Sequence, residues 1–336
     1  MKKILATVLA LCMIVALCAI APIASAEGAT YAIVPKSAGN PYMERMVSGF
    51  EAACKEVGAE CLAVYPEDVS VEAQIAVINN LIAQGVDAIG VAANDAEALE
   101  ATLEEAKAQG IVIVTMDSDT TGSQMFINQA GTKEVAQVLI DSCYDMSGGE
   151  GQFAVLSASS TATNQNAWID AMKEIIDADP DKYGKLEWVA TVYGDDEAQK
   201  SYAETESLMT NYPELKVICC PTTVGILACA QAVQAAKSDI KVAGLGLPSE
   251  MNGFVGEDLP CPYMYLWNPI DVGSCAVYVI ESIIKGDTTC AVGETFTAGN
   301  GIEYTVSEET TCGAQIIVGP PFAFNAENIA DWATVY

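Results

Sequence analysis

The sequence contains no histidine. Histidine is the side chain used most often for general acid–base catalysis, and it is also a common metal ligand. The sequence also lacks the G-x-S-x-G turn of hydrolases, the G-x-x-x-x-G-K-[ST] phosphate loop and any metal-ligand cluster. Hydrolase and kinase activities are therefore excluded, and we expect no enzyme, no catalytic residue, no cofactor and no metal site.

Basic residues are scarce. The chain has 15 Lys and Arg against 45 Asp and Glu, with a formal net charge of −30. Such a charge repels phosphate backbones and anionic lipid surfaces, so nucleic acid and membrane surfaces are poor partners. Most of this acid is expected on a solvated surface, and a neutral ligand suits the chain better than an anionic one.

Long apolar runs are absent beyond the N-terminus. Lys2 and Lys3 precede an apolar stretch over residues 4–23, which ends in Ala-Ser-Ala at residues 24–26. This pattern predicts a signal peptide over residues 1–26, and hence an exported, periplasmic protein. A leucine precedes each cysteine of the stretch, whereas a lipid anchor needs a small residue there, so a soluble protein is favoured over a lipoprotein.

C-x-x-C pairs, which would indicate zinc or redox chemistry, are also missing, although the chain has 12 cysteines. Most of those beyond residue 26 lie in apolar patterns, where cysteine acts as a small buried hydrophobic residue. An exported protein can form disulfides, and Cys54 with Cys61, or Cys290 with Cys312, are possible pairs.

The rest of the sequence alternates short β-branched segments with amphipathic segments, at a spacing of roughly 25 to 30 residues. This alternation predicts repeated βα units and parallel sheets. A first series ends near residues 126–129, and a second begins at Lys133, so two α/β lobes are expected. The predicted strands cover residues 31–35, 61–65, 88–92 and 111–116, then 152–157, 188–193, 217–220 and 242–245.

Polar loops follow these strands, at the end of a parallel sheet where ligands bind. Amides, carboxylates and hydroxyls are common in any turn, but their recurrence after successive strands indicates a polyol site. Asp117, directly after an apolar strand, is the best candidate for a hydroxyl-binding carboxylate, and Lys36 is a candidate donor. Hydroxyl binding explains Asp117 and Asp119 with fewer assumptions than acid–base catalysis.

Other residues of these loops allow two interpretations. Asp195 and Asp196 follow a predicted strand and can simply cap the next helix. Tyr42 and Trp267 can stack on a sugar ring or belong to the core.

Specific segments resemble the ribose-like (type I) class of periplasmic binding proteins, and more closely the rhamnose-binding proteins of bacterial ABC importers. The resemblance extends over nearly all of the chain beyond residue 26. Its most specific segments are LSA at 156–158, TNQN at 163–166, ATVYGDD at 190–196, PTTVGI at 221–226, GLGLPSEM at 244–251 and LWNPID at 266–271.

This resemblance implies two Rossmann-like lobes, each a parallel sheet flanked by helices, joined by a three-strand hinge. The expected first lobe covers residues 27–130 and 268–290, and the second covers 131–267 and 291–336. A monomer is expected to close on a small neutral sugar and deliver it to an ABC permease. The implied ligand contacts are Lys36, Tyr42, Asn94 and Asp117 from the first lobe, Asn164, Gln165, Pro221 and Thr223 from the second, and Trp267 and Asn268 near the hinge.

The ligand itself stays open at this stage. A sister group binds autoinducer-2 and shares residues matching Lys36, Asp117 and Gln165, but Asn164 and Thr223 follow the rhamnose-like pattern. Tyr42 with Met43 replaces the usual pair of Phe, and Met116 replaces the usual Trp, so another sugar or a linear polyol is possible. A sensory receptor would use the same site.

Overall fold

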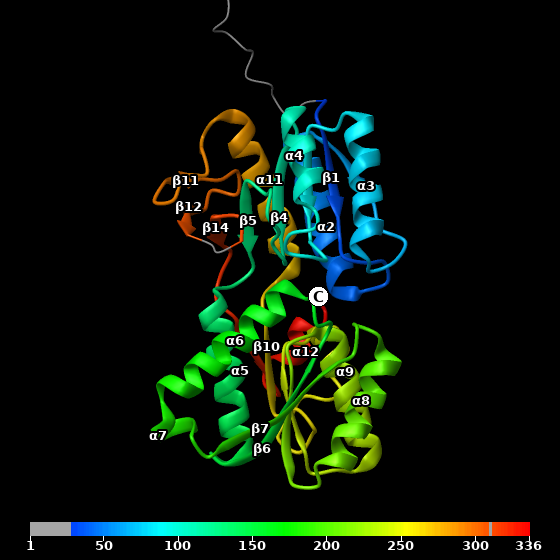
Figure 1. The fold of residues 1–336 in the computed structure, drawn as a ribbon, viewed down its shortest axis with the longest axis vertical. Coiled ribbons are helices and arrows are strands. Elements are labelled where there is room, and N and C mark those ends of the chain that lie inside the picture. Colours follow the sequence, from blue (N-terminus) through cyan, green and yellow to red (C-terminus); the bar gives the residue numbers. More distant parts are fainter. Residues whose placement is uncertain (1–27, 309–310) are drawn as a thin grey trace, which may run out of the picture.

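The computed structural model describes residues 28–308 and 311–336, so the predicted signal peptide lies outside the described residues. The chain forms two α/β lobes stacked along its longest axis (Figure 1). Each strand predicted from the sequence is present, and each lobe has its own mainly parallel sheet. The predicted fold class is therefore confirmed.

The sheet of the first lobe has the strand order β13-β14-β5-β4-β3-β1-β2. Its pairs are parallel except that of β13 with β14. Side chains of β1 alternate between two cores: Tyr31 and Ile33 face one, Ala32 and Val34 the other. The strands are β1 (Thr30–Val34), β2 (Glu60–Ala63), β3 (Ala88–Val91), β4 (Val112–Met116), β5 (Met125–Asn128), β13 (Ser307–Glu308) and β14 (Ala314–Ile317).

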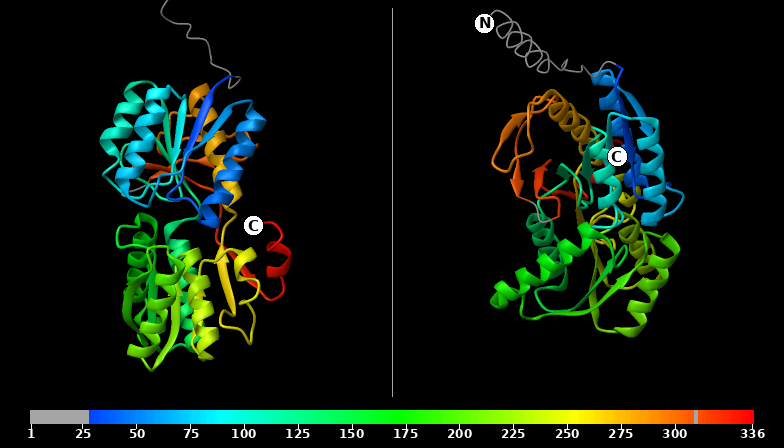
Figure 2. Two further views of the ribbon diagram at one scale, coloured as in Figure 1. Left: turned by 90° about the vertical axis from the view of Figure 1, so that its right-hand side faces the viewer. Right: turned by 45° about the horizontal axis from the view of Figure 1, so that its top comes forward.

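Helices cover both faces of this sheet (Figure 2). On one face lie α3 (Val71–Gln84) and α4 (Glu100–Ala108), and on the other α2 (Pro41–Val57) and α11 (Pro269–Lys285). The last two helices pack unusually closely, because a Cβ on Gly273 would lie 1.9 Å from the backbone oxygen of Met46. Glycine thus brings α11 from late in the chain against α2.

The sheet of the second lobe is parallel, with the order β7-β6-β8-β9. Beside it, β10 (Tyr263–Leu266) pairs antiparallel with β15 (Phe322–Asn325), and α12 (Ile329–Trp332) follows. The parallel strands are β6 (Gly151–Ser157), β7 (Leu186–Tyr193), β8 (Leu215–Cys220) and β9 (Lys241–Gly244). The helices are α5 (Thr132–Ser147), α6 (Thr163–Ala178), α7 (Pro180–Tyr183), α8 (Ala198–Asn211), α9 (Thr223–Ala236) and α10 (Pro248–Met251).

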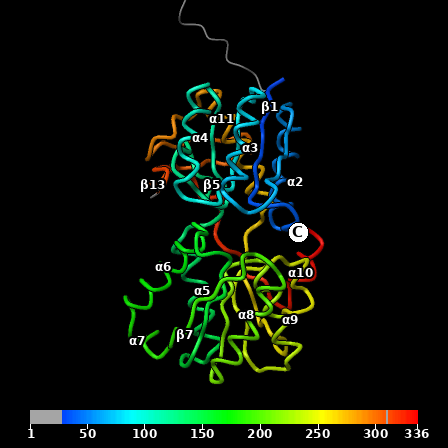
Figure 3. The backbone as a smooth tube through the Cα atoms, turned by 45° about the vertical axis from the view of Figure 1, so that its right-hand side comes forward, coloured from blue at the N-terminus to red at the C-terminus, as the bar shows by residue number. Residues whose placement is uncertain are grey.

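Three segments connect the lobes, as the backbone tube shows (Figure 3). They join β5 to α5 at residues 129–131, β10 to α11 at 267–268, and β14 to β15 at 318–321. Because residues 28–308 and 311–336 pass between the lobes at no other place, the lobes can rotate about these segments as a hinge.

The expected lobe boundary after residue 290 is wrong. Residues 291–336 were assigned to the second lobe, but β13 and β14 belong to the sheet of the first, where β14 pairs in parallel with β5. The short hairpin of β11 (Thr295–Thr297) and β12 (Glu303–Thr305) precedes them. Backbone pairing explains the difference, since β5 would otherwise leave an open edge.

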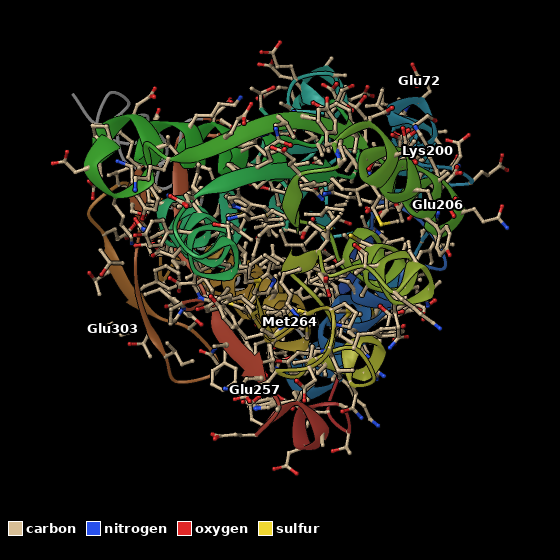
Figure 4. All side chains as sticks on the ribbon, turned by 90° about the horizontal axis from the view of Figure 1, so that it is seen from below. Glu72, Lys200, Glu206, Glu257, Met264 and Glu303 are labelled. Atoms are coloured by element: carbon tan, nitrogen blue, oxygen red, sulfur yellow. The ribbon has the colours of Figure 1, made fainter. Side chains whose placement is uncertain are left out.

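Most acidic residues of the described chain are at least partly exposed, as predicted, although Asp117, Asp119 and Glu281 are buried. Glu206, Glu257 and Glu303 project from the periphery, whereas Met264 lies inside (Figure 4). Cys54, Cys61 and Cys290 are free thiols, so neither possible disulfide forms. Within the described residues, we find no helix that combines the length and the apolar character needed to cross a membrane.

Candidate functional site

A cavity lies between the lobes, at the carboxyl ends of both sheets. It encloses about 370 Å³ of space not filled by atoms, a volume that includes open solvent at its mouth. The lining residues come from both lobes and are Lys36, Asn40, Tyr42, Met43, Asp117, Asn164, Gln165, Trp168, Asp196, Pro221, Thr222, Thr223, Leu245, Leu266 and Trp267.

Helix N-termini surround this cavity. The side chain of Asn40 accepts hydrogen bonds from the backbone N–H groups of Tyr42 and Met43, which starts α2 at the cavity wall. Helices α6 and α9 also begin there, at Thr163 and Thr223. Their partial positive ends favour the acidic groups in the cavity.

Asp117 occupies a strained turn directly after β4. Its φ is 63°, in the left-handed region, and the N–H of Ser118 donates to the carbonyl of Met116 at 2.7 Å. Such conformations are costly and tend to occur at ligand sites, where the surroundings hold them. Gln129 helps to hold the turn, because its Nε2 donates to the Asp117 carbonyl at 3.1 Å.

Lys36 lies beside two carboxylates. Its Nζ is 2.9 Å from Oδ2 of Asp117, and both side chains are largely buried. Asp196, from the second lobe, accepts a hydrogen bond from the Thr222 hydroxyl. Burial raises the pKa of Asp196, an effect that Thr222 and the positive charge of Lys36 oppose and that Asp117 reinforces. One cation therefore acts on a carboxylate from each lobe.

The first turn of α6 supplies amides. Nδ2 of Asn164 donates to Oδ2 of Asp117 at 3.4 Å, which links the lobes. Oε1 of Gln165 accepts from the Ser157 hydroxyl at 2.6 Å and from the Ala158 N–H at 2.8 Å. These bonds fix Gln165 and leave its NH₂ group as the donor for a ligand.

Aromatic rings form another wall. Nε1 of Trp267 donates to the Tyr42 hydroxyl at 2.7 Å, with the two rings edge to face. The ring centroids of Trp168 and Trp267 are 5.7 Å apart. Burial and the nearby Asp117 raise the pKa of the Tyr42 hydroxyl, which therefore stays protonated at neutral pH. Tyr42 and Trp267 are thus buried against other side chains and also line the cavity, so a core role and a sugar-stacking role are compatible for both.

Two predicted contact residues are placed elsewhere. Asn94 lines a neighbouring cavity instead, and its Nδ2 donates to the Lys36 carbonyl at 3.1 Å. Asn268 caps α11, since its Oδ1 accepts from the Ile270 N–H at 3.0 Å, and it does not line the cavity. The remaining predicted residues all line it: Lys36, Tyr42, Asp117, Asn164, Gln165, Pro221, Thr223 and Trp267.

Several lining residues escaped the sequence analysis. Trp168 follows Asn164 by four positions, and this spacing places both on one face of α6. For Asp195 and Asp196 the sequence left open a role as helix caps, but α8 has no side-chain cap, and Asp195 pairs with Lys200. The other missed residues are Asn40, Met43, Thr222, Leu245 and Leu266.

The cavity offers hydrogen-bonding groups and aromatic ring faces. Among residues 28–308 and 311–336 there is no group of three or more side chains that could hold a metal ion. Carboxylates accept two hydroxyl hydrogens, amides donate and accept, and aromatic rings cover apolar faces. This arrangement suits reversible binding of a small neutral polyol.

Comparison with known proteins gives the class to which this fold and site belong. Residues 31–288 match the family described as "Periplasmic binding protein domain". The chain therefore belongs to the periplasmic binding proteins, the solute-binding components of transporters, whose members are exported to the periplasm.

Particular relatives are similar over most of the chain. An ABC transporter solute-binding protein from Clostridium phytofermentas, solved with bound L-rhamnose, is 47% identical, with 92% of this chain and 99% of that chain covered and a TM-score of 0.88. The D-ribose/D-allose-binding protein of Pseudomonas aeruginosa is 25% identical over 63% of this chain and 69% of its own. LsrB from Clostridium saccharobutylicum in complex with AI-2 shares the fold at 20% identity, with a TM-score of 0.82 and 90% and 99% of the two chains covered.

Proposed function

We propose that this protein binds L-rhamnose, or a similar neutral monosaccharide, between its lobes and delivers it to the permease of an ABC importer. The observation that carries the proposal is the combination in one cavity of the Lys36–Asp117 ion pair, the amides of α6 and the Trp168–Trp267 wall. The L-rhamnose complex of the relative at 47% identity supports this choice of ligand.

The proposed ligand contacts divide into three kinds. Lys36 and Asp117 bind hydroxyl groups through charge-assisted hydrogen bonds, which are the strongest available to a neutral sugar. Asn164 and Gln165 supply further donors and acceptors, and Tyr42 and Trp267 cover the apolar face of the ring. Pro221 and Thr223 shape the wall at the start of α9, while Asn94 and Asn268 support Lys36 and α11 rather than the ring itself.

Binding is proposed to work by hinge closure without chemistry. The ligand-facing groups come from both lobes, so the full set assembles only when the lobes approach. Closure removes water from the sugar and replaces its hydrogen bonds with those of the protein. The closed form is then the one that the permease recognises, and the protein acts as a monomer without enzymatic activity.

Export is proposed to proceed by cleavage of the signal peptide after Ala26. The mature protein would then be free in the periplasm, without a lipid anchor.

The test is a binding panel on the mature chain, residues 27–336. Isothermal titration and tryptophan fluorescence, which Trp168 and Trp267 make sensitive to the cavity, are run with L-rhamnose, other hexoses and pentoses, sugar alcohols and autoinducer-2. We expect L-rhamnose or a close deoxysugar to bind best. Binding of autoinducer-2 alone would instead favour the signal-binding alternative.

A pair of variants locates the site. Asp117→Asn removes the buried charged acceptor and should weaken sugar binding by about tenfold or more. Asp170→Asn is the matched control, because Asp170 also lies 2.9 Å from a lysine but is exposed on the surface. Equal affinities for the two variants would contradict the proposed role of Asp117.

A further inference from the structure

A second cavity adjoins the first and is larger, with about 660 Å³ of space not filled by atoms, open solvent included, against about 370 Å³ for the first by the same measure. It too is lined from both lobes, by Ser37 and Asn94 on one side and by Ser159 and Thr161 on the other. Lys36 and Asp196 line both cavities and stand where they meet. The two cavities are therefore neighbouring compartments of the interlobe cleft.

The two compartments differ in chemistry. The first contains the aromatic residues Tyr42, Trp168 and Trp267, which suit a sugar ring with an apolar face. In the part of the chain that the structure describes, the residues lining the second include no aromatic. The second compartment thus favours a group held by hydrogen bonds at its edges rather than one stacked on a ring.

The second compartment also has polar groups to offer. Asn94 uses one amide hydrogen for the Lys36 carbonyl, at 3.1 Å, which leaves its Oδ1 as an acceptor. The hydroxyls of Ser159 and Thr161 lie 3.3 Å apart, so one bond between them leaves further donor and acceptor capacity at both. Hydroxyl groups of a ligand can use all three side chains.

Charge limits the kind of group that fits. Asp195 and Asp196 both line the second compartment, while Lys36 is already paired with Asp117 and Lys200 is paired with Asp195. An anionic group would add to the negative charge of Asp195 and Asp196, whose neighbouring cations Lys200 and Lys36 are already paired, so a neutral, hydroxylated unit is favoured.

We propose that the cleft accepts a two-unit glycoside: a rhamnose-like ring in the first compartment and a second neutral sugar unit in the second, with the linkage passing between Lys36 and Asp196. The inference rests on the proposed function, because it places the monosaccharide in the first compartment. It extends the ligand class from free monosaccharides to neutral rhamnose-containing disaccharides.

The experiment compares three ligands by isothermal titration: L-rhamnose, a disaccharide with rhamnose at its non-reducing end, and one with rhamnose at its reducing end. The two disaccharides differ in which side of the ring carries the second unit. We expect at least one of them to bind as tightly as rhamnose or more tightly.

Matched variants then test the second compartment. Thr161→Trp places a large ring in it, from an exposed loop position where folding should tolerate the change. Ser160→Trp is the control, since Ser160 is the exposed neighbour of Thr161 and does not line the cavity. Thr161→Trp should weaken disaccharide binding by about tenfold or more and leave rhamnose binding unchanged, whereas Ser160→Trp should alter neither.

The outcomes separate this inference from the proposed function. If the protein binds rhamnose but neither disaccharide, the proposal that the second compartment holds a sugar unit is wrong, and the proposed monosaccharide site still stands. If the second cavity is only an entrance, Thr161→Trp slows association of all three ligands and leaves the ratio of their affinities unchanged, which also overturns it. A protein that binds none of the three ligands contradicts both proposals.

Discussion

Each lobe places one carboxylate in the shared cavity, and the two carboxylates have different neighbouring charges. Asp117 of the first lobe pairs with Lys36 of its own lobe at 2.9 Å. Asp196 of the second lobe accepts a hydrogen bond from the Thr222 hydroxyl of its own lobe, and the positive charge that acts on it is that of Lys36 from the other lobe. Lys36 therefore acts on the second carboxylate only when the lobes are close, so closure and charge balance are coupled.

The largest expected effect follows from removing this shared cation. Lys36→Met leaves Asp117 and Asp196 facing each other without a counterion, which opposes closure and removes a ligand donor. Removing one partner of a buried pair typically costs about 3 kcal/mol or more, so we expect sugar affinity to fall by about 100-fold. Isothermal titration measures it directly.

Lys173→Met is the matched control, because the Lys173–Asp170 pair has the same 2.9 Å separation on an exposed surface. Such surface pairs contribute little, so binding should be unchanged. If Lys36→Met binds sugar like the control, the coupling between charge and closure is wrong.

A second comparison concerns how each lobe holds its cavity helix. In the first lobe, a Cβ on Gly273 would meet the Met46 backbone oxygen at 1.9 Å, where α11 supports α2. In the second, a Cβ on Gly225 of α9 would meet side-chain atoms of Thr222 and Leu156 at 2.5 and 2.9 Å. Side chains can rotate away, whereas paired helix backbones cannot.

We therefore expect Gly273→Ala to lower the free energy of unfolding by about 2 kcal/mol and Gly225→Ala by less. Urea denaturation followed by circular dichroism gives both values. Gly253→Ala serves as the reference, because a Cβ there meets no atom within 4 Å. A larger loss for Gly225→Ala would show that the second lobe is the more tightly constrained one.

The same difference between local and distant contacts decides what the sequence could predict. Lys36 and Asp117 were found because they lie just beyond the carboxyl ends of β1 and β4, and strand ends of parallel sheets meet at one edge. Predicting Trp168 as a lining residue would have required knowing which face of α6 turns toward the cavity. Predicting the position of Asp196 would have required knowing its hydrogen-bond partner, Thr222, which lies on a loop 26 residues away.

The fold shows the same limit. The βα alternation predicted both parallel sheets, because each unit is recognisable from its own hydrophobic pattern. The sequence analysis missed that β14 returns to the first sheet, because β14 and the strand it pairs with, β5, are far apart in the sequence. The side chain of Asn128 in β5, for example, donates a hydrogen bond to the side chain of Gln315 in β14, 187 positions later. Short strands with alternating exposure carry too little pattern to reveal such a partner.

The smallest expected effect is a pH dependence at Asp196. Burial raises the pKa of this carboxyl in the folded protein, so the folded state holds its proton more tightly than the unfolded chain does. Stability from this group is present at low pH and is lost as pH rises from the ordinary Asp range through the raised pKa. Lys36 opposes this shift, whereas Asp117 and Asp195 reinforce it.

Asp196→Asn removes the titration while keeping an acceptor for Thr222. The variant should therefore gain stability over the wild type near neutral pH, and this gain should shrink as the pH is lowered toward 4, as thermal unfolding across that range will measure. Exposed Asp170→Asn is the control for a general effect of removing one negative charge. A gain that grows on acidification would mean that Lys36 outweighs burial at Asp196, and that the second lobe's carboxylate is as well compensated as that of the first.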